Sequence, residues 1–329
     1  MLFSLYLKCQ YNPINPLLSL PISNTFSNER QTGDEREKNL NIQHIVKMKK
    51  YSFSGHESFY CKSLWLKKGY DFLAEGRSFL DDDAVVRLGV GKNMVTAIRF
   101  WLKAFGLTVN DQLTPLAKLI FDSEHGCDSF VEDTNTLWLL HYSLVRTNVA
   151  SMYNLLFTDY QREKKEFDKA SLDAFIQRKC SVPEQKNVYN ANTVNKDMGV
   201  LLKSYLTPEN MTAMEDFSAL LINLNLLRRI DKDTYAFNET PTSAINPAII
   251  FYAILDSRGD DATMSFDKIQ ELALTFCMSV PAFTSIVRDL EKSCSNIFHY
   301  TENSGIRNIQ FIDTNVDKFQ ILTKYYEQR

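Results

Sequence analysis

Glycine, proline and cysteine are all scarce in this chain of 329 residues, which contains 11, 9 and 6 of them respectively. Few helix breakers leave long stretches uninterrupted, and this favours a helix-rich protein. The six cysteines are scattered and form no CxxC motif, which excludes a disulfide framework and is typical of the reducing cytoplasm. The sequence also lacks an apolar run of membrane-spanning length, so it predicts no membrane helix and no membrane partner.

A surplus of positive charge is absent as well. The chain has 37 Lys and Arg residues against 40 Asp and Glu residues, a formal net charge of −3. A uniformly cationic surface for nucleic acid is therefore excluded, and any contact with DNA must come from a local patch. The apolar fraction of 44% is that of a globular protein, and the length favours two or three domains.

The first 47 residues differ from the rest. Their apolar part is interrupted by Pro13 and Pro16, and residues 26–47 are polar and aperiodic, so they do not make a signal peptide. Met48 lies just ahead of the first clear structure. We predict that residues 1–47 are a disordered tail or a wrongly assigned start, with Met48 as the true start.

The stretch from residue 80 to 120 has the pattern of a DNA-binding unit. Glycines interrupt it at the positions where helices would end. The predicted elements are a helix at 84–88, a turn at 89–91, a helix at 92–105 and a short hairpin at 107–114. A helix–turn–helix followed by a wing places its second helix in the major groove of double-stranded DNA.

The helix predicted at 92–105 has two distinct faces. At 100° per residue, Met94, Ile98, Trp101 and Phe105 share one side, which would face the core. The opposite side carries the candidate DNA-binding residues Lys92, Asn93, Thr96, Arg99 and Lys103. An ordinary amphipathic helix with solvated lysines is the alternative. A phosphate-binding loop at Gly91-Lys92 is excluded, because Val86 and Asn93 occupy the positions that need Gly and Ser or Thr.

Two further segments follow the same plan. In the first, a helix at 194–206 carries Lys196 and Lys203 on one side, which we add to the candidate DNA-binding residues. A helix at 215–227 and a hairpin turning at 231–233 complete either a second winged-helix-like unit or a set of helices with a β-ribbon. In the last segment, 264–312, two helices precede a hairpin, a plan that suits DNA or protein binding equally.

The sequence therefore predicts a mainly α protein with small β-hairpins (α+β), built of tandem winged-helix-like modules joined by helical connectors at 131–158, 160–180 and 244–256. Residues 181–192 are polar and predict a linker. The predicted domains are an N-terminal DNA-binding domain at 48–180, a middle domain at 193–256 and a C-terminal domain at 257–329.

Three motifs resemble a bacterial family catalogued as a domain of unknown function and associated with DNA phosphorothioation. They are Ser54 to Phe59 (SGHESF), Leu88 to Val95 (LGVGKNMV) and Asp133 to Tyr142 (DTNTLWLLHY). From Tyr51 onward the chain resembles the B component of single-strand (Ssp) defence systems. The resemblance implies DNA nicking in an antiviral system related to restriction–modification. Cysteine desulfurase and ATP-pyrophosphatase or PAPS-reductase-like proteins are its implied partners.

Nicking a phosphodiester needs an activated water and usually carboxylate-held Mg²⁺ or Mn²⁺. We take His56 and Glu57 as candidate catalytic residues, or as a clamp between domains, and Glu57, Asp133 and His141 as candidate metal ligands. Helix capping is the alternative for Asp133, and a position at the end of its helix is the alternative for His141.

Two hypotheses follow from these observations. The chain is either a DNA-binding and metal-dependent nicking component of a modification system, or a non-catalytic winged-helix adapter or transcriptional regulator that recruits partners to DNA. Whether it is an enzyme stays open at this point.

Overall fold

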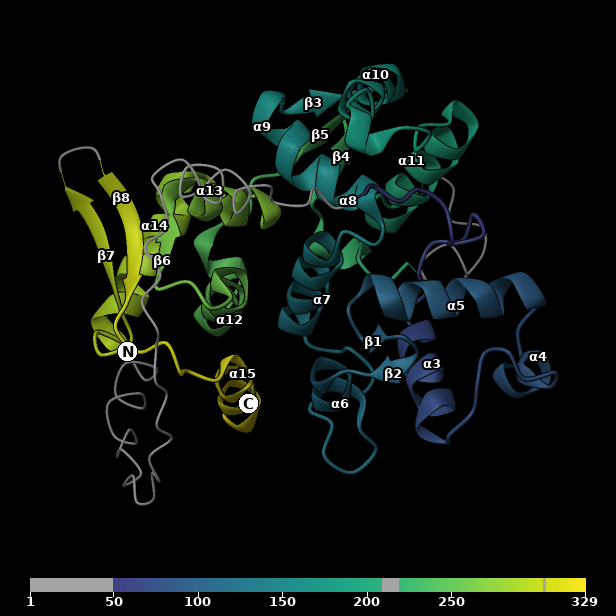
Figure 1. Cartoon of the computed structure of the whole chain (residues 1–329), viewed down its shortest axis with the longest axis horizontal. Coiled ribbons are helices and arrows are strands. Elements are labelled where there is room, and N and C mark those ends of the chain that lie inside the picture. Colours follow the sequence, from purple (N-terminus) through teal and green to yellow (C-terminus); the bar gives the residue numbers. More distant parts are fainter. Residues whose placement is uncertain (1–49, 209–218, 304–305) are drawn as a thin grey trace, which may run out of the picture. The chain divides into compact units, whose positions relative to one another are not determined.

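Within the described residues, three β-hairpins each follow a pair of helices, and this order organises the fold (Figure 1). The computed structural model describes residues 50–208, 219–303 and 306–329. Its contacts divide the chain after Lys50, and all the elements belong to the unit Tyr51–Arg329. Helices predominate and the strands form small antiparallel sheets, as the sequence predicted.

The first segment has the helices, the glycine turn and the hairpin that its sequence predicted. Gly89 ends the first predicted helix at φ +62°, and Gly106 follows the second at φ +68°. Asn110 and Asp111 both have positive φ, as a two-residue hairpin turn requires. The elements are α3 (Trp65–Ala74), α4 (Ala84–Leu88), α5 (Lys92–Ala104), β1 (Thr108–Val109), β2 (Gln112–Leu113) and α6 (Pro115–Phe121).

A central helix replaces the first predicted connector. Every residue of α7 (Thr134–Thr147) from Thr136 to Val145 is buried, so this helix belongs to the core rather than to a linking segment. The chain continues through α8 (Ser151–Leu155), a π-helical turn at Leu156–Tyr160 and α9 (Gln161–Glu163).

The middle segment forms a three-stranded sheet with two helices. Its strand order is β3-β5-β4, so the strand that precedes the helices pairs with the last strand of the hairpin. The hairpin turns at 231–233, as predicted. The elements are β3 (Glu166–Phe167), α10 (Lys169–Lys179), α11 (Ala191–Tyr205), β4 (Leu227–Arg229) and β5 (Tyr235–Phe237).

Two predictions for this segment were wrong where the structure describes it. The helix expected at 215–227 lies partly outside the described residues, and its described part, 219–227, contains no α-helix. A 3₁₀ turn at Ile222–Leu224 ends at Asn225, whose φ of +49° stops helical continuation before β4 begins. Residues 181–192 are not a free linker either, because the fully buried Gln185 accepts a hydrogen bond from the backbone of Tyr51.

The last segment contains the predicted helix, helix and hairpin, together with a helix and a strand ahead of them. Ser265 caps the first of the two helices, as expected. The elements are α12 (Pro247–Arg258), β6 (Thr263–Ser265), α13 (Phe266–Thr275), α14 (Val280–Ser293), β7 (Phe298–Asn303), β8 (Ile306–Phe311) and α15 (Lys318–Glu327). No single helix in the described ranges is long and apolar enough to cross a membrane; only the pair α13–α14, bent by 108°, passes that test jointly.

The middle and last segments share one topology. The last sheet has the order β6-β8-β7, which corresponds strand by strand to β3-β5-β4. In both segments a strand precedes two helices and a hairpin, and that strand pairs with the far strand of the hairpin. Each sheet is therefore closed by a very short strand of two or three residues, and the sequence analysis had identified neither of them.

Candidate functional site

Helix α5 separates its two faces as the periodicity predicted. Lys92, Asn93, Thr96 and Lys103 are exposed, whereas Ile98 and Trp101 are almost completely buried. The glycine turn leads directly into the first exposed residues, because Gly91 is the residue before the helix. The exposed face is thus free of the core and open to a partner.

One cation of this face has another role. The guanidinium of Arg99 makes two hydrogen bonds to the carboxylate of Asp111, with N–O distances of 3.0 and 2.5 Å. Asp111 lies in the turn of the β1–β2 hairpin, so the pair fixes the hairpin against the helix. An arginine held in this bidentate way is largely neutralised and geometrically fixed. Arg99 therefore positions the hairpin, and is less suited to a phosphate than the sequence suggested.

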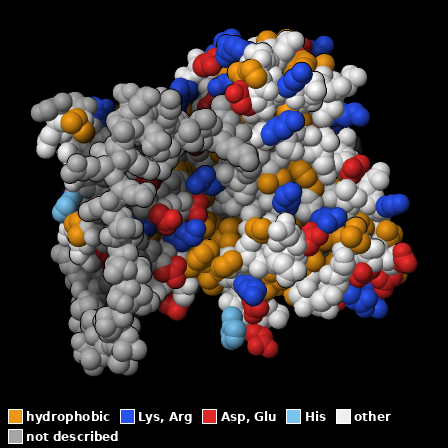
Figure 2. Space-filling model, in the orientation of Figure 1, with side chains coloured by type: hydrophobic (Ala, Val, Ile, Leu, Met, Phe, Trp, Pro, Cys, Tyr) orange, Lys and Arg blue, Asp and Glu red, His pale blue; other side chains and the backbone are white. Residues whose placement is uncertain are grey.

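Lys92 and Lys103 differ from Arg99. Both are exposed, and neither forms an ion pair with any residue that the structure describes. On the face shown in Figure 2, Lys and Arg side chains are interspersed with acidic ones, as expected from the net charge. Unpaired cations on a defined helix face therefore say more about a DNA-binding surface than the overall composition does.

The two candidate catalytic residues lie in very different environments. His56 is buried, and its Nε2 lies 3.0 Å from an oxygen of Asp197 on α11. Its Nδ1 accepts a hydrogen bond from the backbone N–H of Ser58 at 3.1 Å. The ring proton therefore lies on Nε2 and is donated to Asp197. With both ring nitrogens engaged, His56 has no lone pair left for a general base.

Asp197 completes a clamp between the start of the unit and α11. Its carboxylate accepts the hydrogen bond from His56 and also the backbone N–H of Ser54, at 3.1 and 3.0 Å. The His56 ring stacks on Trp101 of α5, with ring centroids 6.1 Å apart. His56 thus ties the start of the unit to α11, through a partner that is 141 residues away in the sequence.

Glu57 lies beside this clamp but points to solvent. It is exposed, and the residues around it have unusual backbone conformations. Ser54, Gly55, Glu57 and Ser58 all have positive φ, between +49° and +102°. Such a run is costly for residues other than glycine and persists only where the surroundings enforce it. Of the two candidates, only Glu57 is accessible to a substrate.

Asp133 and His141 have structural environments. Asp133 caps α7, accepting the backbone N–H of Asn135, and also binds Tyr325 and Arg329 of the C-terminal helix region. His141 is fully buried in the middle of α7, not at its end as expected. Its ring nitrogens bond to the hydroxyl of Tyr205 at 2.8 Å and the carbonyl of Thr275 at 2.7 Å.

The three candidate metal ligands therefore do not come together. Glu57 is exposed near the clamp, whereas Asp133 and His141 have their polar atoms engaged at separate positions on α7. Across the described residues, no group of three His, Cys, Asp or Glu side chains is arranged to hold one metal ion. Glu57, Asp133 and His141 therefore do not form a Mg²⁺ or Mn²⁺ site together.

The buried histidine has a measurable consequence for stability. Burial lowers the pKa of His141 from 6.5 to about 4. Between these values the unfolded chain binds a proton that the folded chain does not, so stability falls as the pH drops from 6.5 towards 4. At about 1.36 kcal/mol per pKa unit, the loss is about 3 kcal/mol. In urea titrations at pH 7 and pH 4.5, His141→Gln should lose less stability on acidification than the natural chain; parallel losses would contradict this origin.

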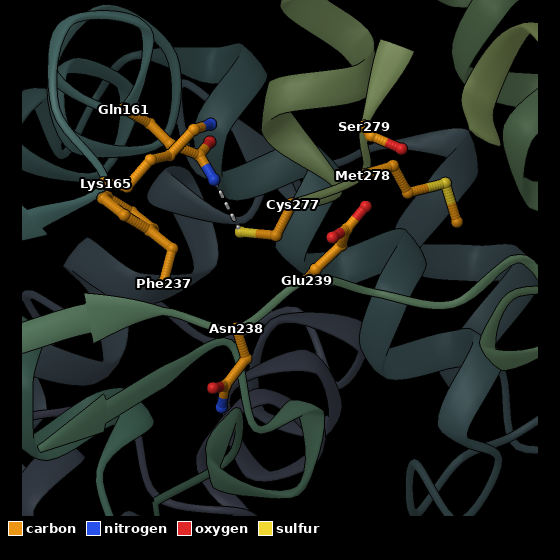
Figure 3. A pocket seen from close by; sticks show the side chains of 8 residues that line it. All are labelled: Gln161, Lys165, Phe237, Asn238, Glu239, Cys277, Met278 and Ser279. Carbon is orange, nitrogen blue, oxygen red and sulfur yellow. Dashed lines mark hydrogen bonds between the residues drawn. The ribbon is translucent and has the colours of Figure 1, made fainter. Parts of the chain in front are cut away.

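A small pocket is lined by Cys277 together with the polar side chains of Gln161, Lys165 and Glu239 (Figure 3). It has a volume of about 280 Å³, and the side-chain amide of Gln161 lies 3.3 Å from the Cys277 sulfur. Burial raises the pKa of this thiol to about 12. Since the thiolate is the reactive form, Cys277 is a poor nucleophile and a structural residue.

Lys196 and Lys203 both lie exposed on α11, as the sequence predicted. Lys203 lines a larger hollow, of about 490 Å³, together with two cations that the sequence analysis had missed, Lys169 and Arg229. No local pattern could have found them, because they belong to α10 and β4 and meet Lys203 only in the folded chain.

Comparison with known proteins gives two kinds of match. A family model described as "Protein of unknown function (DUF4007)" matches residues 53–326. A solved structure described as "SspB crystal structure" has a TM-score of 0.71 and 26% identity, and one described as "Magnesium ion-bound SspB crystal structure" has a TM-score of 0.69 and 24% identity. Each alignment covers 84% of this chain and 88% of the other. No curated protein matches.

Proposed function

The chain belongs to the DUF4007 family of proteins of unknown function, and from that premise we propose that it is the DNA-binding component of an Ssp-type DNA phosphorothioation defence system. The solved structure described as "SspB crystal structure" supports this assignment, at 26% identity over most of both chains. The same proposal includes association with the other proteins of such a system, cysteine desulfurase and ATP-pyrophosphatase-like enzymes among them.

The exposed face of α5 is the observation that carries the DNA-binding proposal. Lys92 and Lys103 lie there without ion-pair partners in the described part of the chain, on a helix that follows a glycine turn. The Arg99–Asp111 pair holds the β1–β2 hairpin beside the same helix. This arrangement presents cations and small polar groups towards phosphates and base edges, with a hairpin placed as a wing.

The topology supports the proposal that the unit is built of winged-helix modules. The middle and last segments each have the order strand, helix, helix, hairpin, with the first strand paired to the last. A helix also precedes each of these strands, α9 in one case and α12 in the other. In this scheme α5, α11 and α14 are the equivalent second helices, and the hairpins that follow them are the wings.

Replacing Lys92 and Lys103 together by Gln tests the proposal. Each phosphate contact on duplex DNA contributes roughly −0.9 to the slope of log K against log[salt]. The double variant should bind a duplex more weakly and flatten that slope by up to about two units, measured by fluorescence anisotropy at several salt concentrations. Both lysines are exposed, so the melting temperature should stay within a few degrees.

A control pair of exposed lysines, Lys118 and Lys186, changes the net charge equally. If the Lys118→Gln/Lys186→Gln variant flattened the slope as much as the α5 variant, α5 would be excluded as the DNA interface. Arg99 is left unchanged in this design, because its removal would release the hairpin as well as a charge.

The adapter hypothesis has its own support. Both nitrogens of His56 are hydrogen-bonded in the interior, which favours a structural function for this candidate catalytic residue. Supercoiled plasmid incubated with the protein and Mg²⁺ or Mn²⁺ distinguishes the two functions. Open circles that disappear with Glu57→Gln would identify a nickase, since Glu57 is the accessible member of the pair; intact plasmid with retained binding would identify an adapter.

A further inference from the structure

The hollow beside α11 has a lining that suits a nucleotide. Three cations surround it, Lys169 at the start of α10, Lys203 on α11 and Arg229 on β4, and no acidic residue is among its described lining side chains. Tyr60, Tyr235 and Leu202 supply apolar surface between them. The cations suit the phosphates of a nucleotide, and the apolar surface suits the face of its base.

Two of these cations differ from those that ion pairs hold in place. Elsewhere, cations such as Lys67, Lys179 and Arg178 form ion pairs with nearby carboxylates. Lys169 and Lys203 form none with the described residues, although both are exposed. The guanidinium of Arg229 lies 5.6 Å from the centre of the Tyr235 ring, a contact that orients its hydrogen-bond donors.

Gly199 forms part of the floor of the hollow and has no structural reason to be glycine. It lies inside α11, where glycine costs stability relative to alanine. A Cβ atom added there would have nothing within 4 Å among the residues that the structure describes, so close packing against them does not require its absence. A glycine in the middle of a helix is explained if a ligand approaches the backbone at that point.

The surrounding residues of α11 extend the site in one direction. Lys196, Gly199 and Lys203 are spaced at i, i+3 and i+7, so they share one face of the helix. The two lysines are separated by about 10.5 Å along the axis, at 1.5 Å per residue. Cations spaced along both sides of an open floor match the successive phosphates of a strand. A single isolated anion would not need cations spaced in this way.

We propose that this hollow binds an unpaired deoxynucleotide of single-stranded DNA, with its base over Gly199 and its flanking phosphates at Lys169, Lys203 and Arg229. A base paired within a duplex cannot enter a concave site, whereas an unpaired one can be inserted and stacked. The hollow lies between α11 and the β4–β5 hairpin, the counterparts of α5 and its wing. The inference deepens the proposed function and rests on it, since it assigns a strand-separated substrate to a DNA-binding protein.

The test compares three variants at the hollow and one control variant of the full chain, in anisotropy measurements with a labelled 12-nucleotide single strand and the matching duplex. Lys169→Gln/Lys203→Gln should weaken single-strand binding about tenfold and flatten its salt slope by about 1.4 units, at roughly 0.7 per contact. Gly199→Gln, which fills the floor, should weaken it similarly. Gly199→Ala should raise the melting temperature, because alanine is the better helix former. Lys118→Gln/Lys186→Gln is the charge-matched control.

The outcomes separate this inference from the function on which it rests. Loss of single-strand binding in the Lys169→Gln/Lys203→Gln and Gly199→Gln variants, with duplex binding retained in Gly199→Gln, supports the inference. Unchanged single-strand binding in both hollow variants overturns it while leaving duplex binding by α5 intact. If neither DNA form binds the natural chain, the proposed function itself fails. If free dTMP or an acidic peptide displaced the labelled strand as well as the unlabelled single strand does, the hollow would be assigned to another ligand. That result would also overturn the inference.

Discussion

Replacing His56 by Ala should lower the free energy of unfolding by about 3–5 kcal/mol, the cost of leaving a buried charge without its partner. The carboxylate of Asp197 is 4% exposed and would keep only the backbone N–H of Ser54. The melting temperature should fall by roughly 10 °C in a unit of this size. Thermal unfolding followed by circular dichroism measures the change.

A double-mutant cycle makes this expectation specific. If the two side chains stabilise each other, the loss in His56→Ala/Asp197→Ala should be smaller than the sum of the two single losses. The neighbouring Glu57→Ala is the matched control, and it should change stability by no more than about 0.5 kcal/mol because the side chain is exposed. Equal losses for His56→Ala and Glu57→Ala would show that the clamp does not support the fold.

Trp101→Ala should have an effect of similar size, about 3–5 kcal/mol, as expected for truncating a large core side chain. Trp101 is 1% exposed, and its ring contacts His56, Phe105 and Tyr153. Its indole N–H also donates to the carbonyl of Phe59 at 3.1 Å. The variant removes one of two aromatic residues, with Phe100, through which α5 contacts the His56 ring, and urea unfolding at constant pH measures the loss.

Two further variants test whether packing or the hydrogen bond accounts for the loss of stability in Trp101→Ala. Trp101→Phe keeps most of the packing but removes the N–H, so its loss should be that of one hydrogen bond, about 1 kcal/mol. Phe130→Ala removes an aromatic ring that is 63% exposed and should be nearly neutral. A stable Trp101→Ala protein would mean that the region around α5 can rearrange, and that the two faces of this helix are less distinct than the burial indicates.

The parts that could be predicted from the sequence depend on neighbours along the chain. Gly89, Gly106 and the Asn110-Asp111 turn determine local backbone conformation, and the α4–α5–hairpin segment followed from them. The apolar stripe of α5 is likewise a local periodicity. These features need no knowledge of the rest of the chain, which is why their boundaries were close to those observed.

The candidate site was harder to predict because its contacts join distant residues. His56 and Glu57 are adjacent and polar, yet one is buried against Asp197 and the other faces solvent. Arg99 had the right helical phase for DNA, but its partner Asp111 comes from a hairpin that only the fold places beside it. Periodicity gives the face of a side chain and does not give its partner.

The same limitation explains the errors in secondary structure. β3 is only two residues long, and nothing in Glu166–Phe167 indicates a strand until β5 pairs with it. The leucine-rich stretch after Ala219 has enough apolar residues for a helix, but its chain makes a bridge to Lys62 and turns at Asn225. Tertiary pairing there overrides local helix propensity.

The separation between His56 and Asp197 also affects the order in which the protein can mature during synthesis. At a translation rate of about 5–20 residues per second, the 141 residues between them take roughly 7–28 s to emerge. During that interval the 54–58 loop has left the ribosome while its partner on α11 does not yet exist. The His56 ring is then without its carboxylate partner, which defines a period in which a nascent chain of this kind is exposed to chaperones and proteases.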